Sequence, residues 1–258
     1  QNTNIYVKRT TSLFLNVRGF GFNVMYDPNG RIYITLEPYY SNKVQGLCGN
    51  MNGNTDDDLT NSAGIVEALP GFCNSWMAAT CVVQPYSGPV QPCTFSDSSA
   101  AKDLCGYVGG SVFSECVKVL EWKRYRTMCE YDMCARENPS DNTPLCTMVS
   151  ALATACEKAD IIVNWQADST LRELCAESNG YQCTGGQSFQ MCANPCGTCR
   201  DQQLDESYCD SDECVSGCSC PDGQLLDDYG QCVNKEQCSC YDLYDPQNPL
   251  KGPGDISK

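Results

Sequence analysis

The sequence predicts a multidomain, disulfide-rich fold: an antiparallel β region that forms part of a sandwich, then a small α-helical domain, then a loop-rich, cysteine-knotted domain. Three observations predict it. The chain has 22 cysteines among 258 residues, a density typical of extracellular proteins stapled by disulfides. Short runs of β-branched and aromatic residues fill the first 40 positions, whereas a helical apolar period comes much later. From residue 183 regular periodicity disappears, while ten cysteines follow up to Cys238.

Composition narrows the classes of function. The chain has no histidine, which excludes Ser-His-Asp and Cys-His catalysis and the H-E-x-x-H zinc site, and we expect no enzyme. A zinc protein with cysteine ligands alone stays open as the other use of so many cysteines. The formal net charge of −15 argues against nucleic acid and anionic membranes and favours cations and basic partners. No apolar run approaches the ~18 residues of a membrane span.

Residues 1–88 are predicted to form the β region. The strand signal lies at residues 5–7, 13–17, 22–26 and 31–36. Between the last two runs, Asp27-Pro28-Asn29-Gly30 supplies turn residues, because proline fixes φ and Asn-Gly tolerates positive φ. The sequence therefore predicts a hairpin in an antiparallel sheet that makes up only part of a sandwich.

A loop rich in oxygen ligands occupies residues 46–59. Carboxylate and amide oxygens suit a hard cation such as Ca²⁺, which takes six to eight of them. The other interpretation is a polar turn with a solvated acidic end, and spacing alone leaves both open. The candidate calcium ligands are Asn50, Asn52, Asn54, Asp57 and Asp58, with Asp56 as the weakest candidate.

Residues 89–178 are predicted to form the helical domain, after a short linker at 89–93. Residues 96–105 indicate a capped helix and residues 112–120 a second one. The clearest helix begins at Thr143 and Pro144, because threonine suits the N-cap and proline the first helical position. Apolar residues then recur on one face, at Leu145, Val149, Leu152, Ala153 and Cys156.

Residues 179–240 are predicted to form a loop-rich domain held by disulfides rather than by a core. Cys196 and Cys199 have C-x-x-C spacing, but a place in the disulfide framework is a better interpretation than a redox role. Prolines and glycines recur in residues 241–258, which indicates an extended linker tail.

Three motifs in order give a resemblance to a known family. A strand hairpin comes first, then Gly-Leu-Cys-Gly-Asn-x-Asn-Gly-Asn at residues 46–54 with its acidic cluster, then Asn-Ser-Trp at 74–76 before Cys81. This order resembles the C-terminal half of a von Willebrand factor type D domain. Residues 89–178 resemble the eight-cysteine domain that follows such domains, down to Trp165 ahead of Cys175. Residues 179–240 are similar to a trypsin-inhibitor-like domain. Such assemblies occur in von Willebrand factor, gel-forming mucins, zonadhesin and marine adhesive proteins.

The resemblance implies a disulfide pairing. In the trypsin-inhibitor-like domain it implies Cys183–Cys218, Cys192–Cys214, Cys196–Cys209, Cys199–Cys238 and Cys220–Cys232. In the eight-cysteine domain it suggests Cys93–Cys134, Cys105–Cys129, Cys116–Cys156 and Cys146–Cys175. The cysteines left over are candidates for interchain disulfides: Cys48, Cys73, Cys81 and Cys240.

The resemblance also bears on partners and on the metal. Family counterparts of Cys48 and Cys81 bond to the N-terminal half of the type D domain, which is absent from this sequence. We therefore expect that half either as a separate, disulfide-linked chain or as a part of the protein outside this sequence, with other subunits or copies as further partners. The resemblance favours Ca²⁺ as a structural ion in the loop. Gln45 stands where relatives often carry the first cysteine of Cys-Gly-Leu-Cys, so an isomerase-like role has no support.

The sequence thus predicts a non-enzymatic structural and interaction module of a large secreted glycoprotein, acting in extracellular adhesion, self-assembly or gel formation. The alternative is a serine protease inhibitor acting through the trypsin-inhibitor-like domain. Its reactive loop would be the segment between Cys209 and Cys214, whose three acidic residues suit neither trypsin-like nor chymotrypsin-like pockets. A lipid-carrier role is a third possibility, but no segment is apolar enough to build a lipid cavity.

Overall fold

The computed structural model describes residues 5–27, 29–78, 95–136, 138–176, 178, 181–203, 214–241 and 250–252. The chain divides into two compact units. Gln1–Ile34 and Pro92–Lys258 make up the first, and Thr35–Gln91 make up the second. Residues 1–88, predicted as one β region, are therefore shared between the two units. Within the described residues, no helix is both long and apolar enough to cross a membrane.

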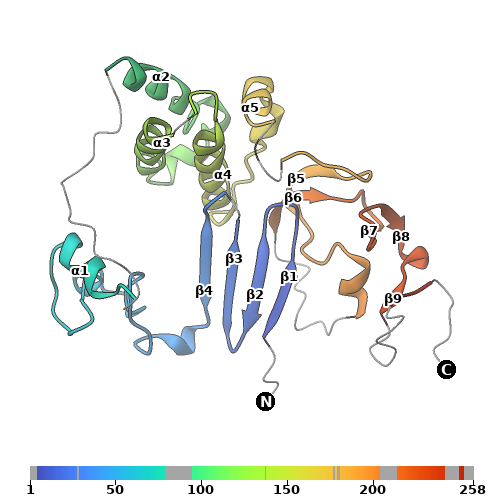
Figure 1. Cartoon of the computed structure of the whole chain (residues 1–258), viewed down its shortest axis with the longest axis horizontal. Coiled ribbons are helices and arrows are strands. Elements are labelled where there is room, and N and C mark those ends of the chain that lie inside the picture. Colours follow the sequence, from blue (N-terminus) through green and yellow to red (C-terminus); the bar gives the residue numbers. More distant parts are fainter. Residues whose placement is uncertain are drawn as a thin grey trace. The chain divides into compact units, whose positions relative to one another are not determined.

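A four-stranded sheet opens the first unit, with strands side by side in chain order (Figure 1). The strands are β1 (Tyr6–Arg9), β2 (Leu15–Gly19), β3 (Phe22–Tyr26) and β4 (Ile32–Leu36). The turn between β2 and β3 has two central residues, Phe20 and Gly21, both at positive φ, as tight hairpins require. The predicted antiparallel strands are confirmed, and β3 has the predicted bounds.

The turn between β3 and β4 is built around Asp27. Its backbone N–H donates to Arg31 O at 2.8 Å, and its Oδ1 accepts the N–H of Asn29 at 2.8 Å. Its Oδ2 accepts from Arg31 Nε at 2.6 Å. The predicted turn at 27–30 thus carries a buried ion pair in addition to its Asn-Gly residues, since Asp27 is 0% exposed.

Four helices follow in the first unit: α2 (Phe95–Cys105), α3 (Lys123–Ala135), α4 (Thr143–Glu157) and α5 (Ser169–Leu174). The predicted apolar face of α4 is confirmed, because Leu145, Val149 and Leu152 are completely buried. The predicted N-cap is wrong. Asn142 occupies that position, and the N–H of Thr143 donates to the Asp141 side chain at 2.9 Å.

The second predicted helix, at 112–120, is wrong. The segment forms two short 3₁₀ turns, Ser111–Phe113 and Cys116–Lys118. Phe113 and Cys116 are both completely buried, so i→i+3 turns set by packing and by the Cys116–Cys156 bridge replace a continuous helix. Sequence patterning also missed α3, whose buried face is narrow and consists of Cys129 and Met133.

The C-terminal part of the first unit consists of short strand pairs. Strand β5 (Ser188–Ala193) pairs with β6 (Val215–Ser219), and β7 (Gln224–Leu226) pairs with β8 (Cys232–Asn234). Strand β9 (Cys240–Tyr241) pairs with β10 (Leu250–Lys251), so part of the segment expected as a linker adds a strand. The rest of residues 242–258, apart from Gly252, lies outside the described residues.

The disulfides follow the predicted pairing wherever both partners are described. The confirmed bridges are Cys105–Cys129, Cys116–Cys156, Cys146–Cys175, Cys183–Cys218, Cys192–Cys214, Cys199–Cys238 and Cys220–Cys232. Cys134 and Cys196 are also disulfide-bonded, while their predicted partners, Cys93 and Cys209, lie outside the described residues. Sixteen of the described cysteines therefore serve disulfides, and these cannot act as zinc ligands.

One hydrophobic core runs through the first unit. It joins Leu13 and Phe14, from the connection between β1 and β2, to the buried face of the helices and to Val215 of β6. Polar contacts reinforce this junction: Thr11 Oγ1 donates to Ser216 O at 2.9 Å, and the N–H of Cys218 donates to Ser12 Oγ at 2.9 Å. The sheet, the helices and the C-terminal strand pairs therefore stabilise one another.

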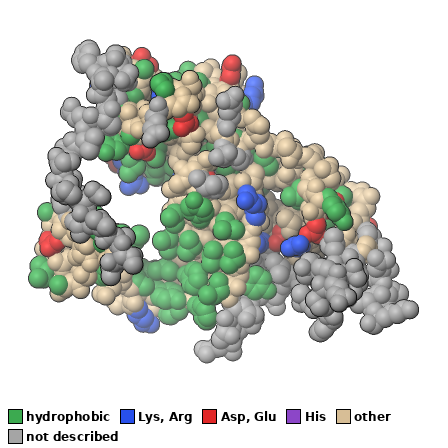
Figure 2. All heavy atoms as spheres, in the orientation of Figure 1, with side chains coloured by type: hydrophobic (Ala, Val, Ile, Leu, Met, Phe, Trp, Pro, Cys, Tyr) green, Lys and Arg blue, Asp and Glu red, His purple; other side chains and the backbone are tan. Residues whose placement is uncertain are grey.

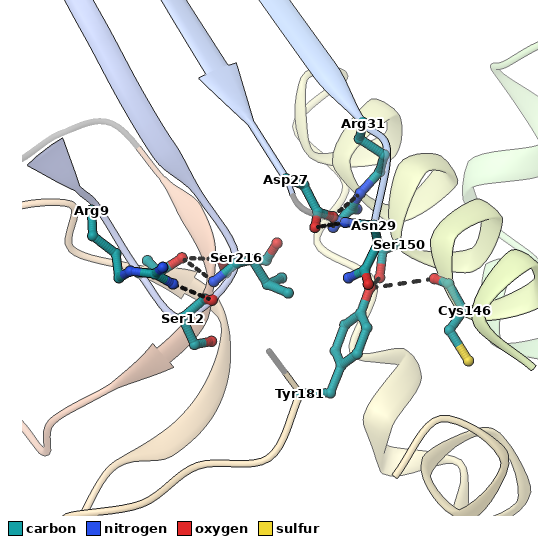
Figure 3. A network of polar contacts seen from close by, with 11 residues as sticks. Arg9, Ser12, Asp27, Asn29, Arg31, Cys146, Ser150, Tyr181 and Ser216 are labelled. Atoms are coloured by element: carbon teal, nitrogen blue, oxygen red, sulfur yellow. Dashed lines mark hydrogen bonds and ion pairs between the residues drawn. The ribbon is translucent and has the colours of Figure 1, made fainter. Parts of the chain in front are cut away.

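A buried polar network lies at the same junction (Figure 3). The Arg31 guanidinium pairs with Asp27 and stacks on the Phe14 ring at 5.2 Å. The Tyr181 hydroxyl contacts Ser150 Oγ and donates to Cys146 O, both on α4. Burial raises the pKa of Tyr181.

Candidate functional site

The predicted calcium loop lies in the second unit, between the 3₁₀ turn Pro38–Tyr40 and the helix α1 (Leu69–Ser75). Its three asparagines form a ladder of Asx turns. Asn50 Oδ1 accepts the N–H of Asn52 at 3.0 Å, and Asn52 Oδ1 accepts that of Asn54 at 2.7 Å. Asn54 Oδ1 accepts the N–H of Asp56 at 3.1 Å and caps the 3₁₀ turn Thr55–Asp57. The alternate spacing of the asparagines therefore fixes the backbone of the loop.

Asp57 is the residue on which the loop converges. Its Oδ2 accepts hydrogen bonds from the side-chain amides of Asn50, at 3.3 Å, and Asn52, at 2.8 Å. Its Oδ1 is buried and has no hydrogen-bond partner in the described part of the chain. Such a carboxylate oxygen is costly to bury unless a donor or a cation satisfies it.

The other predicted ligands are placed differently. A Cβ built on Gly49, which has a φ of +82°, would collide with the Asp58 carboxylate, so Asp58 lies against the backbone of this glycine. Asp56 is exposed. The asparagine oxygens point at backbone N–H groups rather than at Asp57, and no group of three acidic, cysteine or histidine side chains within the described residues could hold a metal. The structure thus brings the side chains of Asn50, Asn52 and Asp57 together.

The Asn-Ser-Trp motif at residues 74–76 holds the segment 60–66, which comes directly after the predicted calcium loop, through two hydrogen bonds. Trp76 Nε1 donates to Thr60 O at 3.3 Å, and the N–H of Ser62 donates to Ser75 Oγ at 3.1 Å. These contacts hold the α1 end against the bridge between Thr60 and Val66. In the described part of this unit Phe72 is the only buried hydrophobic residue, so polar contacts rather than a core organise it.

Three of the four predicted interchain cysteines can be placed. Cys48, Cys73 and Cys240 are free thiols and exposed, with Cys73 on α1 and Cys240 on β9. Cys81 lies outside the described residues, as does most of the segment between Cys209 and Cys214. Three accessible thiols in a chain otherwise rich in disulfides are well suited to bonds with further polypeptide.

The structure adds a surface that sequence reasoning did not identify: one face of the β1–β4 sheet is apolar and bare. Figure 2 shows hydrophobic side chains gathered over these strands. Strand pairing places Val7, Val17 and Val24 on one face, with Leu15 and Tyr26 beside them. The exposed members with their fractional exposures are Ile5 (56%), Val7 (61%), Leu15 (38%), Tyr26 (43%), Ile32 (59%) and Ile34 (54%). We call these six residues the bare face.

The opposite face of the same sheet is the one that is covered. It carries Asn16, which is 6% exposed, and Met25 and Tyr33, which pack against the core of the first unit. The sheet therefore buries its more polar face and exposes its more apolar one. An alternating pattern shows that two faces differ, but not which one the rest of the chain covers.

Comparison with known proteins identifies the modules. The von Willebrand factor type D domain family matches residues 1–65, the C8 domain family residues 104–176 and the trypsin inhibitor-like cysteine-rich domain family residues 183–238. Among similar proteins, SCO-spondin of Gallus gallus is 37% identical over 244 residues, and von Willebrand factor of Bos taurus is 35% identical over 246. Mucin-6 of Mus musculus is 32% identical over 248 residues.

These alignments cover 91%, 93% and 92% of this chain but only 4%, 25% and 8% of the three relatives. The chain therefore spans a quarter or less of the length of these relatives. Because the three family matches occur in the order that the motifs predict, the chain is a von Willebrand factor type D, C8 and trypsin inhibitor-like domain assembly.

Proposed function

We propose that this assembly is a non-enzymatic structural and interaction module of a large secreted glycoprotein, serving adhesion, self-assembly or gel formation outside the cell. The observation that carries the proposal is the bare face. Soluble proteins rarely expose contiguous apolar patches, and large ones mark interaction sites. A sheet with one apolar face packs that face against a second sheet at about 10 Å.

The partner we propose for the bare face is a second β-sheet, contributed by the N-terminal half of the type D domain, in the same or a separate polypeptide. The β1–β4 sheet would then be one layer of a sandwich. The exposed thiol of Cys48 would tie the two layers covalently, and Cys73 and Cys240 would bond to other subunits or modules. Non-reducing and reducing masses of the native protein, with mapping of the Cys48 peptide, test this: a Cys48 thiol that is free in the native protein contradicts it.

Charge placed on the bare face tests the proposal more directly. We expect Ile34→Lys and Val7→Lys to leave stability within about 0.5 kcal/mol, because both side chains are more than half exposed. Both should reduce apolar dye binding and self-association of the purified chain, measured by fluorescence and light scattering. The control is Ile162→Lys, an equally exposed isoleucine (62%) on the helical domain. Equal effects of Ile34→Lys and Ile162→Lys would contradict a special role for the bare face.

We also propose that the loop at residues 46–59 binds Ca²⁺ as a structural ion. The unpartnered buried Oδ1 of Asp57 supports it as the first ligand, and the oxygen-rich composition of the loop fits a hard cation. Asp58 and the oxygens of Asn50, Asn52 and Asn54 are the remaining candidates. The ion would join the loop to the rest of the type D domain and would take no part in catalysis.

Removal of the Asp57 charge should weaken this binding. We expect Asp57→Asn to weaken calcium affinity by at least about tenfold, the loss typical of even an outer-shell change at a metal site. Asp56→Asn changes an exposed neighbour and should have little effect. Isothermal titration, with the melting temperature with and without calcium as a second readout, distinguishes the two variants. Equal affinities would rule out Asp57 as a ligand.

A further inference from the structure

We propose that Asn52 is a site of spontaneous deamidation, at which the side-chain amide is converted to a carboxylate next to Asp57. The reaction needs only water. Asn50 and Asn52 hold the same kind of Asx turn, and in both cases the next residue has a positive φ: Met51 at 57° and Gly53 at 78°. Asn52 alone of the two is followed by glycine, which has no side chain to hinder attack by its backbone nitrogen.

The attacking atom is available. Within the described part of the chain the N–H of Gly53 donates no hydrogen bond, and the space beside its Cα is open, with nothing within 4 Å of a built Cβ. Gly53 is also exposed. Its backbone nitrogen can therefore lose a proton to solvent and approach the side chain of Asn52.

The atom that is attacked, Cγ of Asn52, is held by the Asx turn of this side chain. The Asx turn folds the Asn52 carbonyl back over the Gly53 peptide, and its Oδ1 accepts the N–H of Asn54 at 2.7 Å. A donor placed on a carbonyl oxygen stabilises the oxyanion that forms when the carbon is attacked. The same hydrogen bond that shapes the loop thus favours the reaction.

The chemistry balances without an oxidant or reductant. The Gly53 nitrogen bonds to Asn52 Cγ and loses its proton, the bond from Cγ to Nδ2 breaks, and the amide nitrogen leaves as ammonia. The product is a five-membered succinimide. Water then adds to either ring carbonyl and opens the ring, leaving an aspartyl or an isoaspartyl residue.

A second asparagine that precedes a glycine, Asn29, should be protected from deamidation. Asn29 is also followed by glycine, but the N–H of Gly30 donates to Asp27 O at 2.9 Å, and the N–H of Asn29 is held by the buried Asp27 side chain. The nucleophile is occupied and the turn is fixed. We therefore expect Asn52 to react much faster than Asn29, although glycine follows both.

The change would alter the centre of the loop. Asn52 Nδ2 now donates to Asp57 Oδ2 at 2.8 Å, and a carboxylate in its place would set two negative charges against each other. An isoaspartyl product would also lengthen the backbone inside the Asx ladder. In the presence of the proposed Ca²⁺ the new charge would add an anionic ligand and change affinity. This last consequence depends on the proposed calcium site, but the deamidation itself does not.

Peptide mapping by mass spectrometry tests the proposal on the intact chain incubated in calcium-free buffer at neutral and mildly alkaline pH. We expect the mass gain of amide-to-acid conversion, with aspartyl and isoaspartyl products, to accumulate at Asn52 well before Asn29, Asn50 or Asn54. Asn52→Gln should abolish the signal at this position, because the larger ring forms slowly. An Asn52 that reacts no faster than Asn29 would overturn the proposal.

A gain-of-reaction variant separates this chemistry from loop damage. Met51→Gly replaces a residue at positive φ by the one that tolerates it best, so the loop should fold at least as well. It also places glycine after Asn50, whose Oδ1 already accepts a backbone N–H. We expect Asn50 to become reactive in this variant, and an unreactive Asn50 would also contradict the proposal. Repeating both experiments with calcium added tests the metal separately.

Discussion

Replacing Arg31 by methionine will lower the free energy of unfolding by about 3–5 kcal/mol, the cost typical of breaking a buried ion pair from one side. Asp27 is 0% exposed, and its carboxylate accepts from Arg31 Nε at 2.6 Å. Without the guanidinium, the N–H of Asn29 is the one hydrogen-bond donor left to this buried carboxylate among the described residues. The variant also loses the cation–π contact with Phe14. Chemical denaturation with the disulfides intact measures the change.

Two further variants show whether the loss comes from the unpaired charge. Combining Asp27→Asn with Arg31→Met removes both charges and keeps an acceptor for Asn29, so much of the stability should return. Arg126→Met removes an arginine from another i,i+4 pair, with Glu130, whose side chains are 40% and 28% exposed. It should lose only about 0.3–0.5 kcal/mol. If Arg31→Met and Arg126→Met lower the free energy of unfolding equally, the buried Asp27–Arg31 ion pair does not stabilise the fold more than an exposed pair does.

Local sequence signals predicted the elements whose partners lie nearby in the chain. The pairing of β3 with β4 depends on the turn residues at 27–30 and on alternating strands, and α4 depends on a regular apolar face that the structure buries completely at Leu145, Val149 and Leu152. Its start was misplaced by one residue because Asp141, rather than Thr143, accepts the first N–H. The seven disulfides with both partners described were predicted correctly because the pairing was carried from a family resemblance, and spacing could not have supplied it.

The features that sequence reasoning missed depend on tertiary packing. Helix α3 buries only a narrow face, and the segment 111–118 turns as 3₁₀ because Phe113 and Cys116 are drawn into the core. In the loop, composition identified an oxygen-rich site. It could not show that the asparagine oxygens cap backbone N–H groups, or that Asp57 alone keeps a bare buried oxygen.

The bare face illustrates the same limit. Antiparallel sheets commonly pack their apolar face on the core and leave the other face solvated. The structure instead packs the side that carries Asn16 against the core. Only the three-dimensional arrangement shows that the apolar side stays exposed, which is why the proposed function rests on it.

Truncating Trp165 will test whether the C8 and trypsin inhibitor-like domains fold independently. Trp165 is 1% exposed, and its ring lies 5.4 Å from Tyr181 and 6.2 Å from Phe189 of β5, measured between centroids. Phe189 in turn pairs with Cys218 of β6, next to the contacts with Thr11 and Ser12. We expect Trp165→Ala to cost about 3–5 kcal/mol, as buried Trp→Ala changes do.

The region in which Trp165→Ala loosens the structure is more informative than the amount of stability that it removes. Because one core joins the helices to β5 and β6, amide hydrogen exchange should accelerate in α4 and in both strands together. Tyr229→Ala removes an aromatic ring that is 76% exposed and should change stability by less than about 0.5 kcal/mol. If α4 opens while β5 and β6 keep their protection, the two domains are separate folding units linked by chain alone. If all three open together, the helices and the C-terminal strand pairs unfold as one cooperative unit around the shared core.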